Sequence, residues 1–201
     1  MMTFNRLVRD RSAASAAEFT LVLPLLIVFL FGIIDAGRFM WEYNEAEKAT
    51  QMGARFAVVA EPAASGLSTY SFSISGGVPQ GTAVPTSSFD YAVCNDSDCS
   101  DCAGSFCGNI GYSNAAFRNI VDRMKLMYPP IGYNNVRVEY RNVGLGFAGD
   151  PEGPDVSALV TVRLTGLTFQ PITCFVFACS VSMPDFRAGL TLEDAQGSVS
   201  N

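Results

Sequence analysis

The chain of 201 residues contains no histidine, and this absence excludes several kinds of active site at once. Ser-His-Asp and Cys-His catalysis, histidine-ligated zinc and histidine-ligated haem all require an imidazole. Charged residues are also scarce, at 16% of the chain, and 13 Lys and Arg against 19 Asp and Glu give a net charge of −6. A nucleic-acid-binding protein is expected to carry a basic face, so this class is not favoured.

A long apolar run lies near the N-terminus. Residues 19–34 (FTLVLPLLIVFLFGII) contain no charge, and as a helix they would be about 24 Å long. Counted from Ala13, the run reaches about 33 Å, which is enough to cross a hydrocarbon core of about 30 Å. The basic residues Arg6, Arg9 and Arg11 precede it. Because basic flanks stay in the cytoplasm, the chain is predicted to have its N-terminus inside and its C-terminus outside.

Three interpretations of this run are open: a cleaved secretory signal, an uncleaved anchor, or a helix that packs against partner helices. A secretory signal is not favoured, because residues 35–41 (DAGRFMW) offer no small-x-small cleavage site and because the acidic Glu18 opens the run. A carboxylate at the edge of an apolar helix is tolerated if it pairs with a cation, and the freed α-amine of a neighbouring subunit is one.

The small residues 13–17, followed by Glu18 and Phe19, resemble the class III signal of type IV pilins and pseudopilins. In that family a prepilin peptidase cuts on the cytoplasmic side of the apolar segment. The resemblance implies a cut between Ala13 and Ala14, with residues 1–13 as a cytoplasmic leader. The family usually has Gly before the cut, where this chain has Ala13.

A longer stretch, residues 16–59, resembles the TadE-like family of minor pilins or pseudopilins of the Flp/Tad pilus. The matching elements are Ala-Glu-Phe (17–19), Leu-Pro-Leu-Leu (23–26), Phe-Gly-Ile-Ile-Asp-x-Gly-Arg (31–38) and Gly-Ala-Arg-x-Ala (53–57). The resemblance implies a role in assembling or priming a pilus that serves surface adhesion. The implied partners are other pilin or pseudopilin subunits, the pilus assembly platform, a prepilin peptidase and the lipid bilayer.

The apolar run is predicted to continue as one helix over residues 14–60, with residues 14–34 in the membrane. Glu61-Pro62 should end it, because a residue before proline is driven out of the helical region. Asp35 and Arg38 are spaced for an ion pair on one helix face. Small residues recur at every fourth position, a pattern that permits close helix approach. These small residues are Ala49, Gly53 and Ala57. We interpret them, together with Glu18 and Phe19, as subunit-packing positions. The alternative for the outer half of the helix is packing on the chain's own domain.

Residues 63–201 are predicted to form an extracytoplasmic domain, so the fold class is α+β: a long N-terminal helix, a small antiparallel sheet, one further helix and a disulfide-rich loop. Alternating apolar residues predict strands at 70–74, 136–140, 160–164 and near 190–192. Helical spacing over 117–128 predicts the further helix, with Ser113 or Asn114 as its N-cap and Pro129-Pro130 as its stop.

Six cysteines require an explanation. Cys-x4-Cys-x2-Cys is a pattern of [2Fe–2S] proteins, and Cys-x-x-Cys occurs in zinc and redox sites. An even number of cysteines in an exported domain instead favours disulfides, without metal or cofactor. The expected pairs are Cys174–Cys179, Cys94–Cys107 and Cys99–Cys102.

Two remaining patterns could carry chemistry. Asp96, Asp98 and Asp101 could hold Ca²⁺, but the loop lacks the Gly and the terminal Glu of an EF-hand, so solvated surface acids are favoured. Residues 144–149 match Gly-x-Gly-x-x-Gly, but the prolines Pro151 and Pro154 follow and forbid the helix that would hold a pyrophosphate.

The sequence therefore predicts a non-enzymatic, single-pass inner-membrane protein similar to TadE-like minor pilins, whose domain lies in the periplasm or on the cell surface. It is expected to act through helix packing, with no catalytic residues, metal, cofactor or nucleic acid. The alternative is a membrane-anchored extracytoplasmic enzyme, or a thiol-redox or metal protein, on an uncleaved anchor. The mature N-terminus and the state of the cysteines distinguish the two hypotheses.

Overall fold

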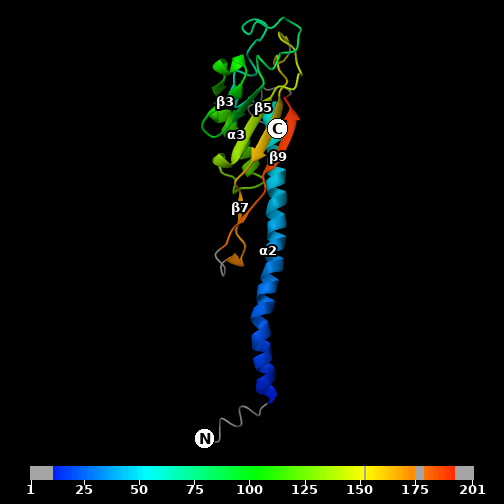
Figure 1. Cartoon of the computed structure of the whole chain (residues 1–201), viewed down its shortest axis with the longest axis vertical. Coiled ribbons are helices and arrows are strands. Elements are labelled where there is room, and N and C mark those ends of the chain that lie inside the picture. The colour runs from blue at the N-terminus through cyan, green and yellow to red at the C-terminus, as the bar shows by residue number, and fades with distance from the viewer. Residues whose placement is uncertain (1–10, 152, 175–178, 193–201) are drawn as a thin grey trace. The chain divides into compact units, whose positions relative to one another are not determined.

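The computed structural model describes residues 11–151, 153–174 and 179–192, and for residues 11–15 the backbone only. The described chain divides into two compact units (Figure 1). The first holds the helix up to Trp41 together with Thr168–Val181. The second holds Glu42–Leu167 and the chain from Ser182 onward. Residues 168–174 and 179–181 thus cluster with the N-terminal part of the long helix.

The long helix α2 runs from Arg11 to Val59 without interruption. Its end agrees with the predicted stop at Glu61-Pro62, and it is helical from the first described residue onward. Residues 13–17, four alanines and one serine, favour helix, because alanine is the strongest helix former. Beyond the helix end, the hydroxyl of the buried Tyr140 accepts a hydrogen bond from the Ala63 amide at 2.9 Å. Burial raises the pKa of Tyr140, so the hydroxyl stays neutral.

A five-stranded antiparallel sheet forms the body of the second unit, in the order β3-β2-β5-β6-β9. Its strands are β2 (Tyr91–Cys94), β3 (Asp101–Ala103), β5 (Val136–Arg141), β6 (Leu159–Leu164) and β9 (Phe186–Thr191). Two further sheets have two strands each: β1 (Ala64–Ser65) with β4 (Gly111–Tyr112), and β7 (Thr168–Phe169) with β8 (Val181–Ser182). The predicted strands at 136–140 and 160–164 are confirmed, and the last strand begins earlier than predicted.

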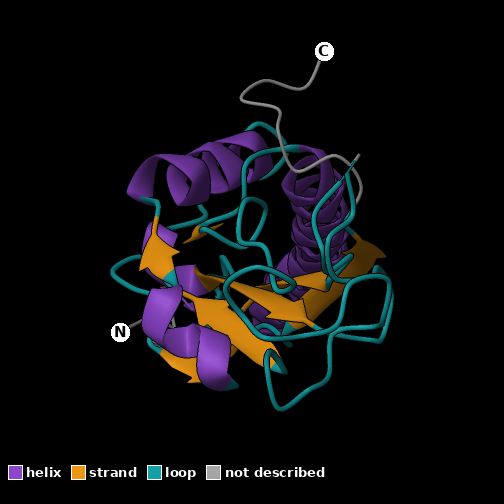
Figure 2. Cartoon of the chain, turned by 90° about the horizontal axis from the view of Figure 1, so that it is seen from above, coloured by secondary structure: helices purple, strands orange, loops and turns teal. Residues whose placement is uncertain are grey.

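Two helices lie on the same face of the five-stranded sheet: the part of α2 from Glu42 onward and α3 (Asn114–Lys125) (Figure 2). Helix α3 begins at a predicted N-cap, Ser113, whose hydroxyl accepts a hydrogen bond from the Ala116 amide. Its apolar face is buried and ends at Met124. Two short 3-10 helices, η1 (Ser105–Asn109) and η2 (Tyr133–Asn135), complete the unit.

The predicted strand at 70–74 is wrong, since this segment forms consecutive turns. The amides of Ser75 and Gly76 donate to the carbonyls of Ser71 and Phe72, a helical pattern of bonds. The amide of Phe72 donates to the Asp155 carboxylate at 2.6 Å instead of to a neighbouring strand. The Asp155 carboxylate, distant in sequence, therefore takes the backbone hydrogen bond that a neighbouring strand would have accepted.

Candidate functional site: the apolar helix and its anchor

The N-terminal half of α2 presents apolar side chains on every side. All side chains from Ala16 to Ile34 are exposed, and among the described residues this is the one helix long and apolar enough to cross a membrane. Phe19 is 65% exposed and Leu21 81%. Because an apolar surface of this extent is costly in water, this half of the helix requires lipid or other helices around it.

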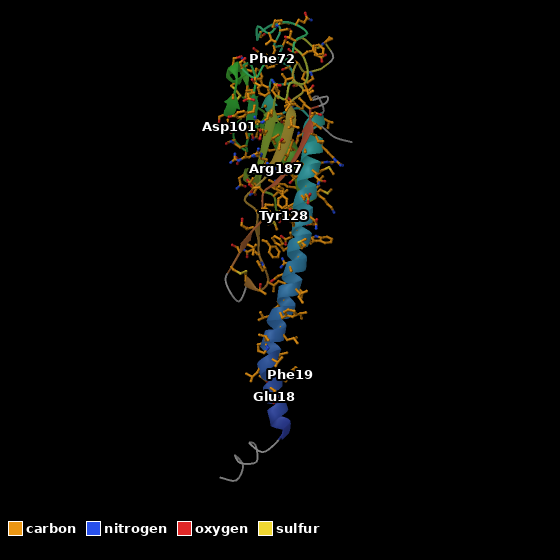
Figure 3. All side chains as sticks on the ribbon, turned by 45° about the vertical axis from the view of Figure 1, so that its right-hand side comes forward. Glu18, Phe19, Phe72, Asp101, Tyr128 and Arg187 are labelled. Carbon is orange, nitrogen blue, oxygen red and sulfur yellow. A yellow bond between two sulfur atoms is a disulfide. The ribbon has the colours of Figure 1, made fainter. Side chains whose placement is uncertain are left out.

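The residues predicted for processing and packing lie at the start of this half. Ala13 and Ala14 are within the helical backbone of α2, and their side chains lie outside the described part of the chain. Glu18 and Phe19 are exposed, and Figure 3 shows both side chains projecting from the helix near its N-terminal end. Glu18 is thus an acidic group on an otherwise apolar surface that faces outward.

Directly after the apolar run, the helix buries a carboxylate. Asp35 is only 6% exposed, although its apolar neighbours are exposed. Its oxygens accept hydrogen bonds from the Ile172 amide at 2.7 Å and from the Thr173 amide and hydroxyl, each at 2.8 Å. Three donors from one short segment satisfy the carboxylate, so Asp35 ties that segment to the helix.

Arg38 strengthens this attachment from the next turn of the helix. Its guanidinium lies 3.5 Å from the Asp35 carboxylate, which confirms the predicted ion pair, and it donates to the Gln170 carbonyl at 3.5 Å. It also lies over the ring of Phe169, which in turn meets Phe39 edge to face at 5.5 Å between centroids. Desolvation raises the pKa of Asp35, but the bonds from Thr173 and Ile172 and the charge of Arg38 outweigh it and leave the pKa below its ordinary value of 3.8.

The small residues Ala49, Gly53 and Ala57 do not form a subunit surface. All three are buried within the second unit. A Cβ added at Gly53 would lie 2.7 Å from Met124 of α3 and 3.4 Å from Val162 of β6. A side chain at position 53 would force Met124 to shift, because α2, α3 and β6 meet closely at this point. Because they are buried, we correct the interpretation of these three residues as subunit contacts. They pack on the chain's own domain, which was the alternative.

All six cysteines form disulfides, and the pairing within the loop differs from the prediction. Cys174 pairs with Cys179, in agreement with the expected bridge. In place of the expected Cys94–Cys107 and Cys99–Cys102, the structure has Cys94–Cys99 and Cys102–Cys107.

Local geometry explains the difference. Strands β2 and β3 form a hairpin, in which Cys94 lies at the turn and Cys107 follows the opposite end. The Asn95 side chain accepts bonds from the Ser97 and Asp98 amides, and this turn brings Cys99 to 4.0 Å from Cys94 between Cα atoms. Cys102 lies on β3 and is 5.9 Å from Cys107 of η1 between Cα atoms, a separation that a disulfide spans.

The acidic loop and the glycine motif hold no assembled site. Among the described residues, no group of three or more Asp, Glu, Cys or His side chains is placed to hold a metal. Asp98 instead accepts bonds from the Asn95 side chain and the Ser100 amide, and so stabilises the turn. Gly144, Gly146 and Gly149 have positive φ angles in bends and turns, and the described residues between them and strand β6 contain no helix.

The sequence predicted the Asp35–Arg38 pair but not the groups of residues 170–173 that bind these two side chains. One signal was available: Asp35 directly follows an apolar run, and a carboxylate buried there needs hydrogen-bond donors besides one exposed cation. Nothing in the sequence around Thr173 indicated that its amide would be the donor, because the two segments are 138 positions apart.

Comparison with known families gives one match. Residues 13–55 match the model of a family described as TadE-like protein. No curated protein and no solved structure matches the chain. The matched segment includes Glu18, the exposed apolar half of α2, the Asp35–Arg38 pair and Gly53. Residues 13–55 of this chain are therefore similar to the TadE-like family.

Proposed function

We propose that this protein is a minor pilin-like or pseudopilin-like membrane component of a Flp/Tad pilus system, acting in pilus assembly or priming through helix packing. One observation carries the proposal. A helix with a TadE-like sequence exposes every side chain from 16 to 34, while the adjoining Asp35 is buried by its own chain. The exposed half is therefore left for lipid and for partner helices, and its role is structural rather than catalytic.

In this proposal, the exposed Glu18 sets the axial position of one subunit's helix relative to that of its neighbour. In the proposed mechanism a prepilin peptidase removes residues 1–13 at the cytoplasmic face of the inner membrane, leaving Ala14 with a free α-amine. The Glu18 carboxylate of one subunit then pairs with the α-amine of its neighbour, because an acid in an apolar bundle needs a cationic partner. Phe19 packs beside that pair, and the second unit lies in the periplasm or on the cell surface.

Removing only the charge at Glu18 tests the mechanism. Glu18→Gln keeps the shape of the side chain, and Glu18→Asp, the matched control, keeps the charge. We expect Glu18→Gln to abolish cross-linking to partner pilin subunits and Glu18→Asp to retain part of it. Non-reducing mass spectrometry should show the three disulfides intact in both variants. Equal cross-linking of Glu18→Gln and the unmodified protein would contradict the mechanism.

The mature N-terminus tests the processing step separately. Mass spectrometry of the protein from membranes that contain a prepilin peptidase should find Ala14 as the first residue. Ala13→Gly restores the residue that the pilin family usually has before the cut, so it should be processed at least as completely. An intact Met1 in both proteins would favour the alternative of an uncleaved anchor.

A further inference from the structure

The segment that Asp35 binds has a surface that the anchoring contacts do not use. We call residues 168–174 and 179–181 the edge segment; it belongs to the same compact unit as the apolar half of α2. The polar groups of Gln170 and Thr173 that contact the helix face Asp35 and Arg38. Elsewhere on the segment, the side chains of Ile172 and Val181 are 41% and 42% exposed. The segment thus combines polar groups that bind the helix with two exposed aliphatic side chains.

The segment is also uncharged, since the sequence from Thr168 to Val181 contains no Asp, Glu, Lys or Arg. An apolar cavity of about 350 Å³, wide open to the outside, lies between the segment and the helix. Its lining includes Ala36, Phe39 and Met40 of the helix and Phe169, Pro171 and Val181 of the segment. The segment therefore adds an open apolar surface to that of the helix, and continuous apolar surface of this kind marks sites of contact with a membrane or a partner.

The position of the segment along the helix indicates what covers it. Asp35 follows the apolar run directly, and the cavity lining extends back to Gly32, one turn inside the run. A residue adds about 1.5 Å to a helix, so the edge segment lies within a few ångströms of the level at which the apolar run ends. If residues 14–34 span the bilayer, that level is the boundary between headgroups and acyl chains.

We infer that the edge segment is a second membrane contact, with Ile172 and Val181 inserted into the interfacial layer of the outer leaflet. The inference rests on the proposed membrane insertion of α2 and adds a contact that the TadE-like match, which ends at residue 55, does not cover. The apolar surface of the segment continues that of the spanning helix, so the lipid that covers one also reaches the other. The Cys174–Cys179 disulfide and the Asp35 bonds hold the segment at this depth.

Tryptophan fluorescence measures the depth directly, because the chain has a single tryptophan, Trp41. In a Trp41→Phe background of the full chain, Ile172→Trp and Val181→Trp each place a probe at an exposed position of the edge segment. Vesicles of phosphatidylcholine are compared with vesicles whose lipids are brominated near the top of the acyl chains. Interfacial apolar side chains lie about 5–10 Å deep, so we expect blue-shifted emission and quenching of about twofold or more.

Two control probes separate the possible failures. Phe29→Trp lies in the apolar run and Ile74→Trp is an exposed apolar position of the second unit. Quenching at Phe29→Trp without quenching at Ile172→Trp and Val181→Trp would overturn the inference while leaving membrane insertion intact. No quenching at Phe29→Trp would contradict the proposed function itself.

Two other results would also overturn the inference. Blue-shifted but unquenched emission at residue 172 would mean that protein, such as a second copy of the chain, covers the segment instead of lipid. Quenching of Ile74→Trp as strong as that of Ile172→Trp would mean that adsorption is nonspecific. Both edge-segment probes replace exposed side chains, and mass mapping of the Cys174–Cys179 bridge verifies that the segment has formed.

Discussion

Gly53→Ala is the perturbation whose effect follows most directly from the structure. The added methyl group would lie 2.7 Å from both Cγ and Sδ of Met124, a side chain with no solvent exposure. Overpacking of this kind costs about 1–3 kcal/mol, whereas replacing glycine by alanine within a helix gains about 1 kcal/mol. The net expectation is a loss of up to about 2 kcal/mol in the free energy of unfolding, with Tm falling by about 2–4 °C for each kcal/mol.

A double-mutant cycle isolates the steric contact from the helix propensity. Met124→Ala alone should destabilise the protein by about 2–5 kcal/mol, because it leaves a cavity. In that background the methyl group of Gly53→Ala has room, so the same substitution should now stabilise the protein by about 1 kcal/mol. Chemical unfolding of the full chain in detergent, followed by near-ultraviolet circular dichroism, measures all four proteins.

The sign change between backgrounds is the decisive result. If Gly53→Ala stabilised the protein equally with Met124 and with alanine at position 124, the close approach of α2 and α3 would be refuted. If Gly53→Ala left stability unchanged but abolished cross-linking to partner subunits, the small-residue pattern would be a subunit contact after all. Gly37→Ala serves as a control for propensity, because no atom lies within 4 Å of the added Cβ.

Three further predictions follow from described contacts. Glu139→Gln weakens two ion pairs, each at 2.7–2.8 Å to a half-exposed arginine, and should lower the free energy of unfolding by about 1–2 kcal/mol in urea titration. Non-reducing peptide mapping should recover Cys94–Cys99 and Cys102–Cys107, and a Cys94–Cys107 peptide would contradict the hairpin geometry. Because the pKa of Asp35 is lowered in the folded protein, its stabilisation is present above pH 3.8 and is lost as pH falls through the folded-state pKa. The protection of the Thr173 amide against hydrogen exchange, taken relative to its intrinsic rate at each pH, should therefore fall only in acid, and equal protection when Asp35 is protonated would refute the link.

Local patterns predicted the elements whose stabilising contacts are themselves local or repetitive. Strand β5 alternates Val136, Val138 and Tyr140 on one face, and that face is buried. Helix α3 has a serine N-cap and a clear apolar face, and its N-cap is the first of the two predicted candidates, Ser113 and Asn114. The apolar run and the TadE-like motifs lie within one helix, which is why the fold class and the family could be recognised from the sequence.

The errors arose where distant partners decide the local structure. Tyr70 and Phe72 alternate with serines, but both pack on the ring of Phe106, at 4.6 and 5.3 Å between centroids. They form an aromatic cluster instead of one face of a sheet. Asp155, 83 residues away, accepts the Phe72 amide that a strand partner would have taken. No periodicity in the segment 70–74 encodes either contact.

The bonds to Asp35 also order events in time. The donor amides of Ile172 and Thr173 follow the acceptor by 137 and 138 positions, so the carboxylate is synthesised long before its partners. Until those residues are made, Arg38, in the same helix, is the partner within reach of the carboxylate. A product truncated before residue 172 would keep the Arg38 ion pair but lack both amide donors and the Thr173 hydroxyl. Full satisfaction of Asp35 therefore reports that the chain has been completed at least to Thr173.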